Sequence, residues 1–237
     1  NSTFKLMGGF QFKQFRIEQD LCGMKVGTDG VLLGAWAKGG RHILDIGTGT
    51  GLIALMMAQR FRSSTIEAID IEENAAKQAQ DNIERSPFSQ QIKVFHTSIQ
   101  QFNSKAINYD AIVCNPPFFE NSLSCNNHQR TLARHTNSLS FNELISCCIK
   151  LLTSNGVLSI ILPTTTRNSF ETEALLQGLY KTEELFVKTS IKKAPKRVLM
   201  QFSKQMTSPV KTSTQLLINS QGERSLWYNE LTQDFYL

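Results

Sequence analysis

Two short segments of this 237-residue chain carry residue types that could do chemistry, and the first is an amide followed by two prolines. Asn115, Pro116 and Pro117 directly follow the apolar run at residues 109–114, and Phe118 comes next. Proline fixes φ, lacks an N–H group and holds the residue before it in an extended conformation. The segment therefore predicts a stiff turn with a fixed amide side chain. Its carbonyl groups receive no hydrogen bond from the prolines, which have no N–H group to donate. The simpler interpretation is a turn that only ends a strand.

The second segment is a glycine-rich turn accompanied by two acids. Residues 45–51 read DIGTGTG, and Asp70 ends the next apolar run. The alternating glycines permit a tight turn and close approach of the backbone to a nucleotide-like ligand. A dinucleotide fingerprint that began at Gly47 would need its third glycine at Leu52, so the spacing does not fit a Rossmann oxidoreductase. An acid ahead of the glycines, Asp45, suits a cationic or zwitterionic ligand better than a pyrophosphate.

Alternating strand and helix patterns must position these two segments. We expect strands at residues 42–47, 65–70, 92–98, 109–114 and 156–163, and helices at residues 51–61, 72–85 and 141–152. This alternation is typical of βαβ units, a parallel sheet and helices on both faces. A helix at residues 168–179 and strands at residues 182–190, 197–204 and 214–220 follow. The fold class is therefore α/β, with a mostly parallel sheet and an antiparallel edge strand.

The N-terminal part of the chain is expected to be extended and then helical. Apolar residues from Phe10 to Ile17 suggest extended structure, and Thr28-Asp29-Gly30 is expected to cap a short helix at residues 31–37. No linker divides the chain, so we expect one domain over residues 1–237, with a cap segment over 1–40 and a core over 41–237. In such sheets ligands bind beyond the carboxyl ends of the strands, which is where both chemical segments lie.

Composition bounds the class of protein. The five cysteines are odd in number, irregularly spaced and without a CxxC pair, which argues against a disulfide framework or a zinc site, so no metal is expected. No apolar run is long enough to span a membrane, and the N-terminus lacks the layout of a signal peptide. A reduced, cytosolic protein is expected.

The charge balance favours a polyanionic partner. Lys and Arg number 25 against 20 Asp and Glu, for a net charge of +5. Lys192, Lys193, Lys196 and Arg197 cluster around Pro195. A solvated loop is the default interpretation of such a run, and a phosphate-binding patch becomes the better one if a nucleotide site lies nearby.

The two chemical segments together resemble a known family of enzymes. DIGTGTG with Asp70 resembles motif I of class I S-adenosylmethionine-dependent methyltransferases, and NPPF at residues 115–118 resembles motif IV of amino-methyltransferases. The resemblance implies a Rossmann-like fold, S-adenosylmethionine as cofactor, and a segment at residues 25–30 that closes over its methionine end. Ser98 stands where relatives often have an Asp that binds the adenine amino group. The residues implied to contact the cofactor are Lys25, Thr28, Asp45, Gly47, Gly49, Gly51, Asp70, Ile71, Ser98, Ile99 and Asn115.

The same resemblance implies how NPPF acts. The Asn115 side-chain oxygen and the Pro116 carbonyl would accept the two N–H bonds of a planar amine and direct its lone pair at the methyl group. Phe118 would stack on a splayed-out base. The tetrapeptide alone fits an adenine, a guanine of ribosomal RNA or the amide of a protein glutamine.

Nearly the whole chain resembles the bacterial tRNA(Val) adenine N6-methyltransferases, through residues 10–37, 84–92, 96–102, 115–122 and 231–237. The resemblance implies methylation of an adenine N6 amine in the tRNA(Val) anticodon loop. A monomer is expected. A tRNA-binding relative without activity is the alternative from another class, and Ser98 is the one feature in its favour. The residues implied to contact RNA are Arg134, Lys192, Lys193, Lys196 and Arg197, with His135 in an RNA-contacting or surface role rather than as a general base.

Overall fold

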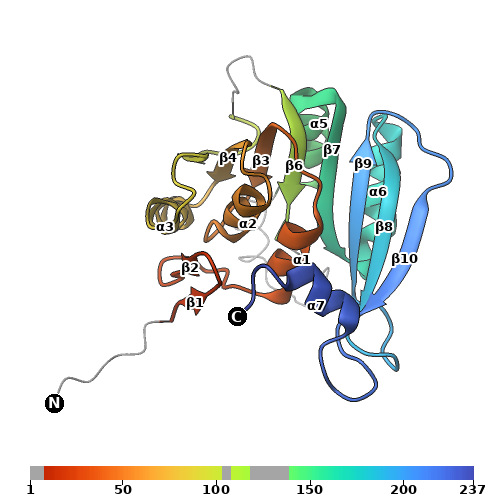
Figure 1. Ribbon diagram of the computed structural model, residues 1–237. Coiled ribbons are helices and arrows are strands. Elements are labelled where there is room, and N and C mark those ends of the chain that lie inside the picture. The colour runs from red at the N-terminus through yellow and green to blue at the C-terminus, as the bar shows by residue number, and fades with distance from the viewer. Residues whose placement is uncertain (1–7, 103–107, 118–138) are drawn as a thin grey trace, which may run out of the picture.

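The computed structural model describes residues 8–102, 108–117 and 139–237 of the chain (Figure 1). The sequence-based expectations for Phe118, Arg134 and His135 lie outside these described residues.

An eight-stranded sheet forms the centre of the fold, with the strand order β10-β8-β9-β7-β6-β3-β4-β5. Its strands are β3 (His42–Ile46), β4 (Thr65–Asp70), β5 (Ile92–His96), β6 (Tyr109–Cys114), β7 (Leu152–Pro163), β8 (Tyr180–Lys188), β9 (Arg197–Ser203) and β10 (Lys211–Leu216). Neighbouring strands are parallel except that β9 runs antiparallel to both β7 and β8. The predicted α/β class with a mostly parallel sheet is confirmed. The antiparallel strand, β9, lies between β7 and β8, in the part of the sheet that ends at the edge strand β10.

Helices cover both faces of this sheet, and each face has its own apolar core. One face packs on α1 (Thr28–Trp36), α2 (Leu52–Arg60), α3 (Glu73–Glu84) and α7 (Leu226–Thr232). The other packs on α5 (Phe141–Leu151) and α6 (Arg167–Leu176), which lie behind the sheet in Figure 1. A short 3-10 helix, η1 (Thr164–Thr166), comes directly before α6. Strands buried on both faces read as continuous apolar runs, which is why β3, β4 and β6 were predictable. Within the described part of the chain, no helix is long and apolar enough to span a membrane.

Three local expectations need correction. The first helix begins at Thr28 after an N-cap at Gly27 that makes no side-chain capping bond, so Thr28 and Asp29 lie in the first turn rather than capping it. Strand β10 begins three residues and ends four residues earlier than expected because its pairing with β8, and not its own apolar content, sets its position. Helix α7 was not expected. Ser225 starts it by accepting a hydrogen bond from the Tyr228 backbone N–H at 3.0 Å.

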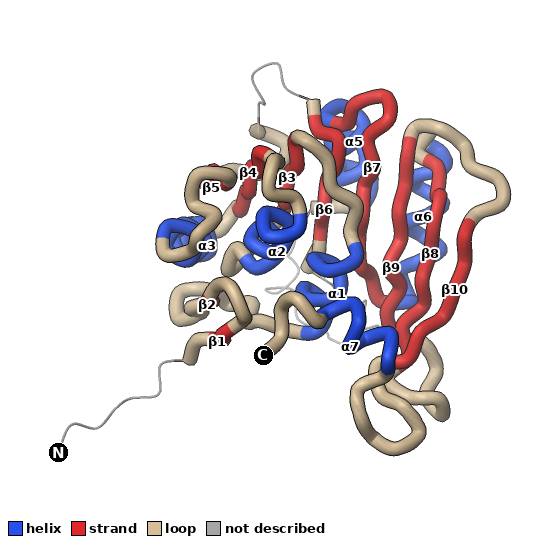
Figure 2. Tube along the Cα trace, in the orientation of Figure 1, coloured by secondary structure: helices blue, strands red, loops and turns tan. Residues whose placement is uncertain are grey.

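The N-terminal hairpin packs on the C-terminal segment. Strands β1 (Phe10–Gln11) and β2 (Arg16–Ile17) pair antiparallel, and Figure 2 shows them at the same end of the molecule as α1 and α7. The Phe12 ring stacks on Tyr236 with the ring centroids 5.9 Å apart. The Lys13 N–H donates to the Phe235 carbonyl at 2.9 Å. Residues 235 and 236 therefore hold residues 12 and 13 in place.

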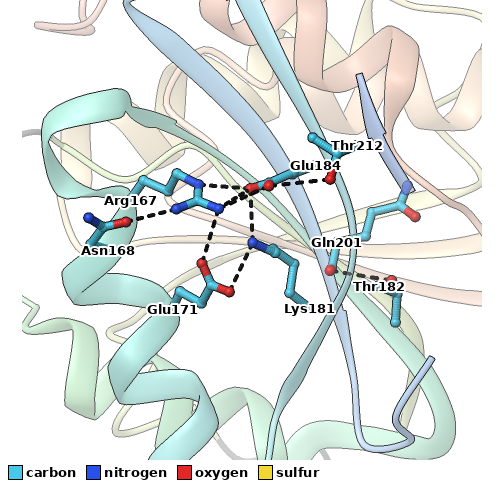
Figure 3. A network of polar contacts seen from close by, with 8 residues as sticks. All are labelled: Arg167, Asn168, Glu171, Lys181, Thr182, Glu184, Gln201 and Thr212. Carbon is cyan, nitrogen blue, oxygen red and sulfur yellow. Dashed lines mark hydrogen bonds and ion pairs between the residues drawn. The ribbon is translucent and has the colours of Figure 1, made fainter. Parts of the chain in front are cut away.

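A charged network fastens α6 to β8 (Figure 3). The Glu184 carboxylate accepts hydrogen bonds from Arg167 Nε at 2.7 Å and from Lys181 Nζ at 3.0 Å. Glu171 pairs with Lys181 at 2.9 Å. Burial raises the pKa of Glu184, but the hydrogen bonds from Arg167 and Lys181 outweigh it and leave this pKa below its ordinary value. The network is thus arranged around an ionised Glu184.

Candidate functional site

A cavity of about 400 Å³ lies beyond the carboxyl ends of the central strands. Three separate stretches of chain line it, namely residues 24–30, residues 47–53 except Gly51, and residues 115–117. Its size is within the range of small-molecule sites, about 300–1,000 Å³. The cavity thus joins the N-terminal segment, the glycine turn and the Asn-Pro-Pro turn that the sequence singled out.

The register of the sheet brings the two chemical segments together. Strands β3 and β6 are parallel neighbours in which Ile46 pairs with Cys114. Gly47 and Asn115 are the next residues in each strand direction, so they leave the sheet side by side. Asn115, Pro116 and Pro117 all line the cavity.

The glycines of the turn serve different purposes. Gly47, Gly49 and Gly51 all have left-handed backbone conformations, with φ of 69°, 56° and 86°. A Cβ added to Gly47 would meet no atom within 4 Å, so the space above this residue is open. A Cβ added to Gly51 would lie 3.4 Å from Ala79 of α3. Gly47 therefore leaves room for a ligand, whereas Gly51 allows α3 to pack against the turn.

Asp45 lies beneath the glycine turn and is hydrogen-bonded to it. Its side chain is fully buried, and Oδ2 accepts a hydrogen bond from Thr48 Oγ1 at 2.7 Å. Oδ1 is buried without a hydrogen-bond partner among the described residues. Burial raises the pKa of Asp45 to about 7. Asp45 thus carries an incompletely compensated carboxylate directly beneath the glycine turn, although it does not line the cavity.

Asp70 connects the glycine turn to the start of α3. Its carboxylate accepts hydrogen bonds from the Gly49 N–H at 2.8 Å and the Glu72 N–H at 2.9 Å. The Thr97 N–H donates to the Asp70 carbonyl at 3.0 Å, which brings Ser98 to the end of the neighbouring strand. Asp70, Ile71, Ser98 and Ile99 do not line the 400 Å³ cavity. They lie next to the turn, at the ends of β4 and β5.

A loop at residues 18–27, called the covering loop below, lies over the glycine turn. A Cβ added to Gly49 would lie 3.6 Å from the Cys22 Sγ, and Met24 and Lys25 line the cavity. The sequence singled out Lys25 and Thr28, which line the cavity as well, but not Cys22 or Met24. A contact between a thiol and a distant backbone turn leaves no periodic signal, so sequence reasoning had nothing by which to find it.

The basic loop between β8 and β9 lies at the same end of the sheet. Lys192, Lys193 and Lys196 are exposed, whereas Arg197 is partly buried. Arg197 Nε donates to Asp29 Oδ2 at 2.9 Å, and Asp29 lines the cavity. The four cations that the sequence grouped together are therefore not equivalent, because Arg197 is bound to the wall of the cavity. Among the described residues there is no group of three or more His, Cys, Asp or Glu side chains that could hold a metal ion.

Comparison with known sequences agrees with this arrangement. A family model described as "Methyltransferase small domain" matches residues 26–190. Relatives named tRNA1(Val) (adenine(37)-N6)-methyltransferase align over nearly their full lengths. The protein of Bacteroides fragilis is 45% identical over 234 residues, which are 96% of this chain and 97% of the relative. That of Escherichia coli is 41% identical over 242 residues, which are 100% of this chain and 98% of the relative.

Solved structures share the fold at low sequence identity. The crystal structure of a predicted O-methyltransferase from Agrobacterium tumefaciens has a TM-score of 0.65 and 16% identity, and it covers 87% of this chain and 96% of that one. P. horikoshii TYW2 in complex with MeSAdo has a TM-score of 0.55 and 15% identity, with 81% of this chain and 69% of that one covered. These likenesses show a methyltransferase fold.

Proposed function

Because this chain belongs to the tRNA1(Val) (adenine(37)-N6)-methyltransferase family, we propose that it transfers a methyl group from S-adenosylmethionine to the N6 amine of an adenine in the tRNA(Val) anticodon loop. The observation that carries the proposal is the pairing of Ile46 with Cys114, which sets the glycine turn and the Asn-Pro-Pro turn side by side on one cavity. A methyl donor held by the first turn would meet an amine held by the second.

The residues of the glycine turn suit this cofactor. S-adenosylmethionine, when bound, supplies a methyl group made reactive by a sulfonium centre. The open space above Gly47 admits a ligand close to the backbone. The buried carboxylate of Asp45 favours a ligand of positive charge over a pyrophosphate. Asp70 lies at the end of the next strand, where a carboxylate can accept hydrogen bonds from ribose hydroxyls.

The Asn-Pro-Pro turn suits a planar amine. An exocyclic adenine amine is a poor nucleophile because its lone pair is delocalised into the ring. In our proposal the Asn115 side-chain oxygen and the Pro116 carbonyl accept its N–H bonds and hold it facing the donor, and Phe118 stacks on the base. Two prolines fix these acceptors before the substrate arrives, so the turn stabilises the transition state without reorganising. The proton can leave after transfer, so no strong base is required.

The exposed lysines of the basic loop provide the contact with RNA in this proposal. Lys192, Lys193 and Lys196 lie at the cavity end of the sheet and would hold phosphates that flank the target. Arg134, outside the described residues, is proposed for the same role. Such contacts position RNA without reading its sequence, so selectivity would come from the shape of the loop and the stacked base.

One mixed-substrate experiment tests the proposal against its alternatives. The protein is incubated with labelled S-adenosylmethionine, total tRNA, ribosomal RNA and a protein release factor. Label in the adenine of tRNA(Val) supports the proposal, whereas label in a glutamine or a guanine assigns the same turn to another acceptor. Cofactor binding without any transfer, or no cofactor binding at millimolar concentration, would favour a tRNA-binding relative without activity.

A further inference from the structure

Helix α3 holds the covering loop through two buried amide side chains. Gln78 and Asn82 are four residues apart, so they lie on the same face of the helix. They are 4% and 1% exposed, and neither lines the cavity. Their side chains instead form hydrogen bonds with backbone groups of other segments.

Asn82 uses its whole amide group to join two segments. Oδ1 accepts a hydrogen bond from the Glu18 N–H at 2.9 Å, and Nδ2 donates to the Glu18 carbonyl at 2.9 Å. The same Nδ2 donates to the Thr50 carbonyl at 2.8 Å. Glu18 begins the covering loop and Thr50 belongs to the glycine turn, so one side chain ties the two together.

Further contacts fix the rest of the covering loop. Gln78 Oε1 accepts a hydrogen bond from the Leu21 N–H at 2.8 Å. Within the loop, Gln19 Oε1 accepts from the Val26 N–H at 2.9 Å, which keeps the segment folded back on itself. Cys22, the residue after Leu21, then lies against Gly49.

We propose that Asn82 and Gln78 are positioning residues that keep the covering loop closed over the glycine turn and so set the rate at which the cofactor leaves the cavity. Residues 24–27 of this loop form one wall of the cavity, and releasing Glu18 and Leu21 from α3 would open that wall. The part of the inference that concerns the cofactor rests on the proposed function. The part that concerns loop closure rests on the hydrogen bonds alone.

The Cys22 thiol offers a direct measure of loop closure. It is 8% exposed because the closed loop presses it against the turn, so a thiol reagent reaches it only when the loop opens. The test compares wild type with Asn82→Ala and Gln78→Ala. Mass spectrometry of peptides follows labelling of Cys22 separately from the other cysteines. Release of labelled S-adenosylmethionine after dilution is measured in parallel.

A matched control separates loop closure from general stability. Gln91 also donates its side-chain amide to backbone carbonyls, those of Phe61 at 3.0 Å and Ser64 at 3.2 Å, but it has no hydrogen bond to the covering loop. Gln91→Ala therefore removes comparable bonds elsewhere. We expect Asn82→Ala to speed both Cys22 labelling and cofactor release by at least about tenfold, Gln78→Ala to speed them less, and Gln91→Ala to leave both unchanged.

Each other outcome counts against the proposal. Wild-type labelling in folded Asn82→Ala, or equal acceleration in Gln91→Ala, would overturn loop closure by α3. Faster labelling with unchanged cofactor release would overturn control of cofactor exchange. If Asn82→Ala does not fold, Gln78→Ala decides alone. If wild type binds no cofactor, the proposed function fails, while Cys22 labelling of the ligand-free protein still decides whether α3 closes the loop.

Discussion

Arg197, the first residue of β9, donates a hydrogen bond from Nε to Asp29 Oδ2 in the first turn of α1, at 2.9 Å across 168 positions of the chain. Asp29 lines the cavity, so this ion pair fixes one of its walls. Both side chains are about one-third exposed, and such a pair contributes roughly 1 kcal/mol or less. Its importance is therefore expected to lie in the position of Asp29 rather than in overall stability.

We expect Arg197→Ala to weaken S-adenosylmethionine binding by about threefold to tenfold, with a melting temperature within about 2 °C of wild type. Calorimetric titration of the cofactor measures the first quantity and thermal unfolding the second. Lys150→Ala, an exposed residue in the last turn of α5 on the other face of the sheet, serves as a control for loss of one positive charge. Equal cofactor affinity in wild type and Arg197→Ala would show that the ion pair does not shape the cavity.

The three exposed lysines of the basic loop should behave differently. Replacing Lys192, Lys193 and Lys196 together by alanine should reduce the slope of log K for tRNA against log salt by about two, because each phosphate contact releases about 0.7–0.9 counterions. The KM for tRNA should rise and cofactor affinity should stay unchanged. Binding titrations at four salt concentrations provide the slope. A slope equal to that of wild type would identify the lysines as an ordinary solvated turn.

Asn115→Ala should remove turnover while preserving cofactor binding. The substitution deletes the side-chain acceptor proposed to hold the amine, and loss of one such preorganised group typically costs a factor of about 10²–10³ in kcat. Single-turnover methylation of tRNA gives the rate, and calorimetry gives the cofactor affinity. Asn229→Ala, an exposed amide on α7, is the control. Methylation by Asn115→Ala at the wild-type rate would remove this residue from the proposed mechanism.

The raised pKa of Asp45 predicts a pH-dependent stability. Because burial raises this pKa to about 7 in the folded protein, the folded state keeps a proton that the unfolded chain loses near pH 4. The contribution of Asp45 to the free energy of unfolding is therefore largest below about pH 4. It falls as the pH rises to about 7, by at most about 4 kcal/mol.

In Asp45→Asn this dependence of the unfolding free energy on pH should be absent, and the variant should be more stable than wild type at pH 8. It should also bind S-adenosylmethionine more weakly. Urea unfolding of both proteins at pH 5, 6, 7 and 8 gives the difference in free energy of unfolding. A difference that is the same at every pH would mean that Asp45 does not titrate in this range.

The charged network around Glu184 should contribute to the stability of the fold and not to methyl transfer. Glu184→Ala leaves Arg167 and Lys181 without their shared carboxylate in a mostly buried place, which should cost roughly 3 kcal/mol of unfolding free energy. The pair of exposed Lys211 with the partly buried Glu183 is the control, and Lys211→Ala should change stability by less than about 1 kcal/mol. Unfolding curves compare the two variants, and a larger loss in Lys211→Ala would contradict this assignment.

The central strands and the position of Gly47 and Asn115 at one cavity could be predicted from sequence because they follow from local patterns. An apolar run followed by glycines or prolines identifies both a buried strand and the turn at its carboxyl end. Strand β10 and helix α7 could not be located correctly, since an edge strand and a short helix depend on tertiary pairing more than on their own residues.

The contacts of Asn82 and Arg197 were beyond sequence reasoning for a related reason. Asn82 is one polar residue of the helix expected at residues 72–85, and its partner Glu18 lies 64 positions away. Arg197 looked like one of four equivalent basic residues, yet only this side chain bonds to Asp29. Nothing in the spacing of either residue marks the distant segment that it meets. The single-domain organisation and the roles of Phe118 and Arg134 stay predictions.

The stacking of Phe12 on Tyr236 has a consequence for how the protein is made. A ribosome delivers the chain from its N-terminus, so β3, β4, β5 and β6, which alternate with their helices, can begin to pair while later residues are still being added. The hairpin at residues 10–17 must wait for residues 235 and 236, the partners of Lys13 and Phe12. A nascent chain would thus possess its glycine turn well before the hairpin that leads into the covering loop is secured. Affinity for the methyl donor would then be acquired only after residues 235 and 236 have been added.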